Sequence, residues 1–220
     1  MLDRIHFILR RRNALHQKNK GSNYHWTAYI DRYSRMAQYT TCGQFSKVEH
    51  SDIAEASYVG AKTCITRSDI GSFCSIGSDV RVGGLDRHPT NLLSTHPAFY
   101  AASNPIGISI FKTEFAATPR TIVGHDVWIG ANSLILSGVN IATGSVIGAG
   151  SVVTKNTKEF GIYAGVPARL IRFRFDETTA QLISESQWWN IGIERIQKIF
   201  ANDKNINIAN IELMLSKLTK

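Results

Sequence analysis

An aliphatic residue recurs at every sixth position from residue 123 onwards. The chain reads VGHDVW, IGANSL, ILSGVN, IATGSV, IGAGSV and VTKNTK, so the recurring residues are Val123, Ile129, Ile135, Ile141, Ile147 and Val153. An α-helix repeats its faces every 3.6 residues and a strand every two, and neither period explains a strict six with a small residue so often after the aliphatic one. Short strands separated by tight turns, each burying one aliphatic side chain, do explain it.

The same spacing runs upstream through two further groups of residues. Ile53, Val59 and Ile65 are six apart, and Ile70, Ile76 and Val82 follow after one step of five. Three such strands make one triangular coil, and repetition at a fixed period is typical of a solenoid in which each coil buries its apolar edge against the next. The residues therefore predict an all-β solenoid built as a parallel β-helix.

This period divides the chain into three expected parts. Residues 1–45 precede the repeat and are expected to form a basic, helical N-terminal segment. Residues 46–170 are expected to form the β-helix, with an excursion over residues 84–120 where the period is interrupted. Residues 171–220 are expected to form a C-terminal helical tail.

The tail has clear helix signals. Pro167 stops further coils, and Asp176 is a suitable cap for a helix that begins at Glu177. A further helical stripe of apolar residues consists of Ile211, Met214, Leu215 and Leu218. We expect this tail to seal the open end of the solenoid or to pack on a neighbouring subunit.

The formal net charge of +8 is concentrated at the N-terminus, where residues 1–20 hold six Lys or Arg against one Asp. The rest of the chain therefore does not predict a nucleic-acid partner. Residues 1–20 also carry apolar residues at helical spacing, a pattern compatible with peripheral contact with an acidic membrane or a polyanionic substrate: Leu2, Ile5, Ile8 and Leu9. A basic helix that packs on a neighbour or lies free in solvent is the alternative.

Three cysteines lack the spacing of a zinc or redox motif: Cys42, Cys64 and Cys74. We expect reduced thiols, no metal and a cytoplasmic protein. The N-terminal sequence MLDRIHFILRRRN has too short an apolar run for a signal peptide. Contact with the inner membrane surface stays open because of the basic N-terminus.

The register, together with DVWIGANSLILSGVNIATGSVIGAGSVVTK and YAGVPARLI, resembles the hexapeptide-repeat acyltransferases. The resemblance implies a left-handed β-helix, whereas the general rule for crossovers predicts right-handed coils. The closing stretch RFRFDETTAQLISESQWWNIGIERIQKIF is similar to the branch that contains chloramphenicol and streptogramin acetyltransferases and related polysaccharide O-acetyltransferases.

The excursion contains two histidines in RHPTNLLSTHPAFY. The resemblance implies that a histidine at the start of such an excursion removes the proton of the acceptor hydroxyl, and His88 has that position. Neutral imidazole suits this role because it can take that proton and return it to the CoA thiolate. His88 is therefore the expected general base, and His96, Tyr100 and Trp128 are expected acceptor-site residues. His125, in a repeat turn, is expected to be a solvated or interface residue.

The resemblance implies acetyl-CoA as co-substrate, bound in a groove along the coils. The matching groove residues are Trp128, Ala131, Ala149, Thr154 and Lys155, and those for the adenine and phosphates are Pro167 and Arg169. Lys155 and Arg169 supply the cations that phosphates require. The resemblance also implies a homotrimer with each site between adjacent subunits.

The expected function is acetyl-CoA-dependent O-acetyl transfer to a hydroxyl of a carbohydrate, such as a bacterial surface polysaccharide or its precursor. A xenobiotic acetyltransferase that inactivates chloramphenicol or streptogramins is the alternative within the same class. Two other classes stay open. They are a metal-dependent hydratase with His88, His96 and His125 as ligands, and a non-catalytic scaffold.

Overall fold

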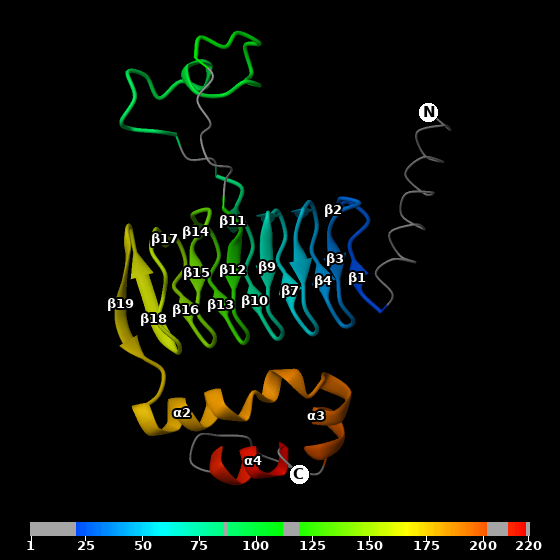
Figure 1. The fold of residues 1–220 in the computed structure, drawn as a ribbon. Helices are drawn as coiled ribbons and strands as arrows, with labels where there is room; N and C mark the ends of the chain where they lie inside the picture. The colour runs from blue at the N-terminus through cyan, green and yellow to red at the C-terminus, as the bar shows by residue number, and fades with distance from the viewer. Residues whose placement is uncertain (1–20, 86–87, 112–118, 202–210, 219–220) are drawn as a thin grey trace, which may run out of the picture.

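The computed structural model describes residues 21–85, 88–111, 119–201 and 211–218. The basic N-terminal segment, residues 1–20, for which membrane contact was one of the readings, lies outside the described residues. The chain forms a left-handed parallel β-helix of about 7 turns, with an excursion on one side and helices along another (Figure 1). The predicted fold class is confirmed.

Three sheets make the walls of the coils. Sheet A has the order β1 (Asn23–Tyr24), β4 (Thr41–Cys42), β7 (Tyr58–Val59), β10 (Ser75–Ile76), β13 (Trp128–Ile129), β16 (Val146–Ile147), β18 (Gly161–Gly165) and β19 (Ala168–Phe173). Sheet B has the order β17 (Val152–Val153), β14 (Leu134–Ile135), β11 (Arg81–Gly83), β8 (Cys64–Thr66), β5 (Lys47–Glu49) and β2 (Tyr29–Ile30). Sheet C has the order β15 (Asn140–Ile141), β12 (Thr121–Val123), β9 (Ser68–Ile70), β6 (Asp52–Ile53) and β3 (Arg35–Met36). The pair β18 and β19 is antiparallel, and the other pairs are parallel.

The recurring aliphatic residues form rows inside the coils. Ile76, Ile129 and Ile147 pair in register across sheet A, and each is fully buried. Equivalent rows line sheets B and C, so that one core runs the length of the solenoid. The predicted register is confirmed because every sixth aliphatic residue from Val123 to Val153 belongs to this core.

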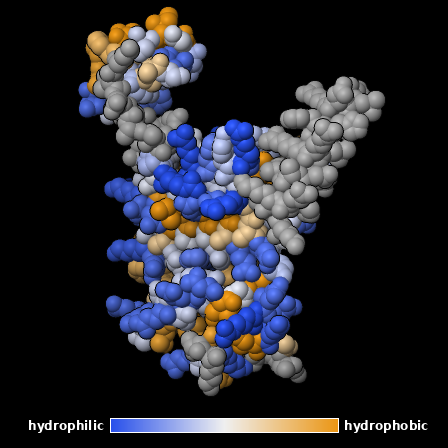
Figure 2. Space-filling view, turned by 45° about the vertical axis from the view of Figure 1, so that its right-hand side comes forward, coloured by the Kyte–Doolittle hydropathy of each residue, from blue (hydrophilic) through white to orange (hydrophobic). Residues whose placement is uncertain are grey.

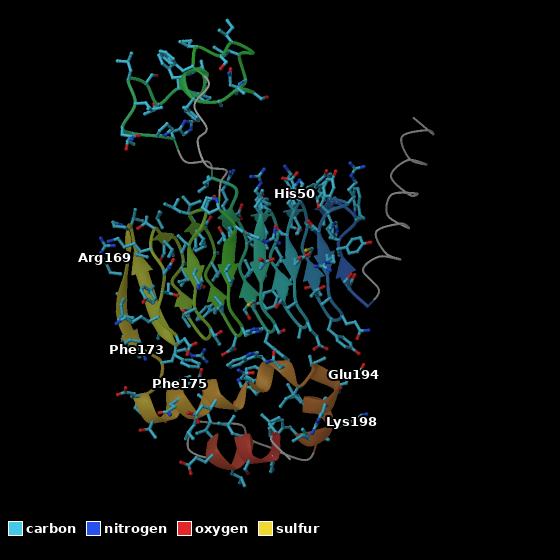
Figure 3. All side chains as sticks on the ribbon, in the orientation of Figure 1. His50, Arg169, Phe173, Phe175, Glu194 and Lys198 are labelled. Atoms are coloured by element: carbon cyan, nitrogen blue, oxygen red, sulfur yellow. The ribbon has the colours of Figure 1, made fainter. Side chains whose placement is uncertain are left out.

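The turns between strands stack into three corners. The A-to-B corner follows sheet A and contains Ala131; the B-to-C corner follows sheet B and contains His50 and Gly84; the C-to-A corner follows sheet C and contains Phe73 and Asp126. Figure 3 marks the B-to-C corner by the label on His50.

Close contact between coils explains the small residue after the aliphatic one at the A-to-B corner. A Cβ atom at Gly77 would lie 2.8 Å from the backbone nitrogen of Ala131 in the next coil. At Gly130 it would lie 2.5 Å from the nitrogen of Ala149. Backbones at this spacing leave no room for a side chain that points at the neighbouring coil.

The boundary predicted at residue 45 is wrong, because β1 to β4 already belong to the solenoid. Arg35 pairs with Asp52 and Thr41 with Tyr58, each in a parallel ladder. The inward residues of these coils are Ile30, Met36 and Cys42, which continue the period of six. Methionine and cysteine at two aliphatic positions concealed the repeat.

The excursion leaves after β11 and returns at β12, and it projects from the coils in Figure 1. Its described part contains one short 3-10 helix, η1 (Pro97–Phe99). Hydrogen bonds connect both of its ends to the coils. At the first end Leu85 N donates to Ser137 Oγ at 2.9 Å, and at the second Arg120 Nε donates to Asp69 Oδ2 at 2.6 Å.

The tail consists of α2 (Glu177–Ser186), η2 (Trp188–Asn190), α3 (Ile193–Ile199) and α4 (Ile211–Leu218). Asp176 caps α2 as predicted, since its Oδ1 accepts from Thr179 N at 2.9 Å. The stripe on α4 is also confirmed, with Met214 and Leu218 buried. None of the described helices has the length and hydropathy needed to span a membrane.

Of the two positions expected for the tail, a seal over the open end of the solenoid is wrong for its helices. The β19 strand lies at the end of the coils, but the helices run back along them at the C-to-A corner (Figure 1). There Trp188 contacts Phe73, with ring centroids 4.8 Å apart, and Trp189 stacks on His125. Because Trp189 covers its ring, His125 is half-buried between the coils and the tail of the same chain.

Candidate active site

His88 lies at the start of the excursion with its side chain exposed. Its Nδ1 atom is 2.8 Å from the backbone carbonyl oxygen of Thr95. A carbonyl oxygen only accepts hydrogen bonds, so this contact requires the proton on Nδ1 and leaves a lone pair on Nε2. His88 thus has the tautomer that a general base acting through Nε2 needs.

The side chain of His96 makes a hydrogen bond within the excursion. Its Nδ1 accepts from the backbone nitrogen of Ala98 at 3.1 Å and so caps η1. The same short helix is tied to the far side of the excursion, where Ile110 N donates to Ala98 O at 2.7 Å. His96 therefore helps to hold the backbone next to Thr95, whose carbonyl contacts His88.

Tyr100 is buried, with 8% of its surface exposed, although we predicted it as an acceptor-site residue. Its hydroxyl oxygen is 2.8 Å from His88 Nδ1, and the two rings are nearly perpendicular at 87°. The structure thus places Tyr100 against the general-base candidate, on the side of the ring opposite Nε2.

Trp128 lies on β13 with its indole outside the coil and 56% exposed. Ser75 is its partner in the next strand of sheet A, and Tyr58 follows in the strand beyond. Tyr58 is 48% exposed, so two aromatic side chains flank Ser75 on one open face. We did not predict Tyr58, but its position directly before the inward Val59 marks it as an outward residue.

The predicted cofactor residues occupy different corners of the coil. Ala131 and Ala149 follow adjacent strands of sheet A and lie at the A-to-B corner, and Pro167 follows β18 in the same sheet. Arg169 is exposed on β19, at the end of the coils (Figure 3).

Thr154 and Lys155 lie at the B-to-C corner, directly after β17. The excursion that carries His88 starts from this corner too, after β11 in the same sheet. One chain therefore presents two sets of predicted site residues at two corners, with sheet B between them. His88 and Lys155 belong to one set, and Trp128 and Ala131 to the other.

The third histidine of the alternative metal site lies at a different corner of the coils. His125 Nδ1 accepts from Ser72 N at 3.0 Å at the C-to-A corner. Its ring stacks on Trp189, and burial lowers its pKa from the usual 6.5. Within the described ranges no three His, Cys, Asp or Glu side chains cluster closely enough to hold a metal ion.

Known proteins share this repeat and much of the sequence. The family described as bacterial transferase hexapeptide (six repeats) matches residues 120–155. A chloramphenicol acetyltransferase of Klebsiella aerogenes is 38% identical over 130 residues, or 58% of this chain and 61% of that protein. A probable macrolide acetyltransferase of Lysinibacillus sphaericus is 31% identical over 161 residues, or 69% of this chain and 83% of that protein. The chain thus spans about three fifths of the chloramphenicol acetyltransferases it matches.

A solved structure shares the fold. It is a variant of AntD, an N-acyltransferase from Bacillus cereus, in complex with dTDP and coenzyme A. The TM-score is 0.60 at 22% identity, over 79% of this chain and 94% of AntD. At this identity the likeness concerns the β-helix and not the substrates.

Proposed function

This chain belongs to the hexapeptide-repeat acetyltransferases, and from that membership we propose that it transfers an acetyl group from acetyl-CoA to a hydroxyl of a carbohydrate. A bacterial surface polysaccharide or its precursor is the proposed acceptor. The observation that carries the proposal is the contact between His88 Nδ1 and the Thr95 carbonyl, because it leaves Nε2 available as a base.

The reaction follows from this tautomer. Nε2 of His88 accepts the hydroxyl proton while the hydroxyl oxygen attacks the carbonyl carbon of the thioester. The tetrahedral intermediate collapses by breaking its C–S bond, and the imidazolium returns the proton to the thiolate of CoA. The Thr95 carbonyl accepts a hydrogen bond from Nδ1 throughout and favours the cation. A positioned base contributes about 10²- to 10⁴-fold to such a rate.

The two sets of site residues support an assembly. In the proposed homotrimer the B-to-C corner of one copy, with His88 and Lys155, faces β13 and the A-to-B corner of the next, with Trp128 and Ala131. The pantetheine arm of acetyl-CoA then lies between two chains, with Lys155 and Arg169 as cations for its phosphates.

Exposed apolar residues on the excursion support the same assembly. Leu93 is 92% exposed, and further apolar side chains are more than half exposed: Ile106, Ile108, Ile110 and Phe111. Figure 2 shows apolar residues gathered on this projecting segment. Such a patch is typical of a surface that another protein surface covers.

Acetylation of an antibiotic hydroxyl is the second candidate function. It is favoured by the chloramphenicol and macrolide acetyltransferases among the relatives. The excursion sequence RHPTNLLSTHPAFY instead resembles polysaccharide acetyltransferases more than antibiotic-modifying ones.

Because acetyl-CoA is a cytoplasmic metabolite, we propose that the reaction takes place in the cytoplasm. Where a lipid-linked precursor is the acceptor, the reaction takes place at the inner membrane surface.

Release of CoA thiol, measured with a panel of acceptors, tests the proposal. The panel contains oligosaccharides, chloramphenicol, a streptogramin and a macrolide, each with acetyl-CoA and the full chain. Thiol release with an oligosaccharide alone is the expected result. Release with an antibiotic alone would overturn the carbohydrate acceptor and establish the second candidate. Absence of release with every acceptor would overturn both.

A further inference from the structure

Two oxygen atoms lie at hydrogen-bond distance from the same nitrogen of His88. The Thr95 carbonyl and the Tyr100 hydroxyl are each 2.8 Å from Nδ1. Imidazole Nδ1 carries at most one hydrogen, so the two oxygens either share it as acceptors or compete for opposite tautomers. The carbonyl cannot donate, which makes the hydroxyl the group whose role must be decided.

A backbone hydrogen bond and a ring contact hold Tyr100 in place. Tyr100 follows η1, and its backbone nitrogen donates to Pro97 O at 3.1 Å. The side chain is buried, and its ring meets the His88 ring edge to face, with centroids 6.1 Å apart. A buried tyrosine hydroxyl requires a hydrogen-bond partner, and here a ring nitrogen of His88 is one.

We propose that Tyr100 is a positioning residue for His88, whose hydroxyl oxygen shares the Nδ1 hydrogen with the Thr95 carbonyl. The inference rests on the proposed function, in which His88 acts through Nε2. It replaces the acceptor contact that the sequence suggests for Tyr100, since the hydroxyl lies on the Nδ1 side of the ring.

The two acceptors have two consequences. They fix the rotation of the imidazole about its Cβ–Cγ bond and therefore the direction of Nε2. They also stabilise the imidazolium that forms when the hydroxyl proton is taken, because both oxygens accept from Nδ1–H. Removing the hydroxyl should leave the Thr95 contact and the ring packing in place. It should weaken both the fixed rotation of the imidazole and the stabilisation of the imidazolium.

Tyr100→Phe removes only the oxygen atom and is the test. We expect kcat to fall by about 10- to 100-fold, as for the loss of one hydrogen bond to a charged group. KM for acetyl-CoA and the thermal midpoint should change little, since the ring remains. Tyr33→Phe is the matched control, because it removes an exposed tyrosine hydroxyl that lies outside the excursion, and its kcat should equal that of the wild type.

A proton–nitrogen NMR spectrum of the imidazoles supplies a readout independent of turnover. In the wild-type protein without substrate the His88 proton should reside on Nδ1, and in Tyr100→Phe the Nε2–H form should gain population. An unchanged tautomer with unchanged kcat would overturn the proposal. So would a higher KM for the acceptor at constant kcat, which would assign Tyr100 to acceptor binding.

The two proposals fail in different ways. If no acceptor in the panel releases thiol while the NMR spectrum shows the Tyr100-dependent tautomer, the contact stands and the proposed reaction is wrong. If thiol is released but Tyr100→Phe is as active as the wild type, the reaction stands and the positioning role is wrong.

Discussion

The imidazole of His125 stacks on the indole of Trp189, with centroids 5.4 Å apart and ring planes 13° apart. These residues join the turn between β12 and β13 to the tail, far apart in the sequence. On the coil side His125 Nδ1 accepts from Ser72 N, a bond that requires an unprotonated nitrogen. The Asp126 to Arg174 ion pair, at 2.9 Å, flanks the contact.

The pH dependence of stability should reflect His125. Burial lowers its pKa in the folded chain below the usual 6.5. Between the two values the unfolded chain binds a proton that the folded chain does not, so stability falls as the pH drops below about 6.5. The urea midpoint of wild type should therefore fall more between pH 7.5 and 5.5 than that of His125→Gln. Parallel losses in both proteins would show that His125 does not titrate in this way.

The cysteines should differ sharply in reactivity. Burial raises the pKa of Cys42 and of Cys74 to about 12, so neither thiol ionises near neutral pH. Cys64 is half-buried on the outer side of β8. A thiol reagent at pH 8 should therefore label one cysteine in the folded chain and all three after unfolding. Rapid labelling of a Cys64→Ser variant in the folded state would refute the buried positions.

The register can be tested with neighbouring residues of β15. Ile141 is fully buried, whereas Asn140 is exposed on the outer side of the strand. Ile141→Asp places an unpaired charge inside the coil and should prevent folding. Asn140→Asp introduces the same charge one residue earlier and should melt close to the wild type. Circular dichroism melts that are alike for both variants would mean that the period has been assigned to the wrong face.

The period of six was sufficient to predict the coils and their inward residues from Ile53 onwards, and the capping residue Asp176 was sufficient to predict the start of α2. It failed at Met36 and Cys42, because a search for Ile and Val does not find inward residues of other types. The path of the tail was not predictable, since the contact of Trp189 with His125 depends on tertiary packing and leaves no periodic signal. The excursion has no period either, so the roles of Tyr100 and His96 beside His88 required the structure.

Subunit mixing tests whether each site lies between two chains. His88→Ala removes a site residue of the excursion that starts at the B-to-C corner. Trp128→Ala removes a site residue on β13 of sheet A. Each variant alone should be strongly impaired. Co-expression should restore about a quarter of the wild-type sites, because random mixing pairs an intact His88 with an intact Trp128 at that frequency in a closed trimer.

A second mixture serves as the control for this experiment. His88 and Lys155 belong to the same corner, so His88→Ala mixed with Lys155→Ala gives sites that always lack at least one of the two residues. This mixture should regain no activity. Equal recovery in both mixtures, or a monomer by mass measurement in solution, would contradict the shared site.

The most direct test of the role of His88 is CoA-thiol release by wild type and His88→Ala, with acetyl-CoA binding measured on the same preparations. We expect kcat to fall by about 10²-fold or more while the affinity for acetyl-CoA stays nearly unchanged. A His88→Ala variant that releases thiol at the wild-type rate would contradict this role.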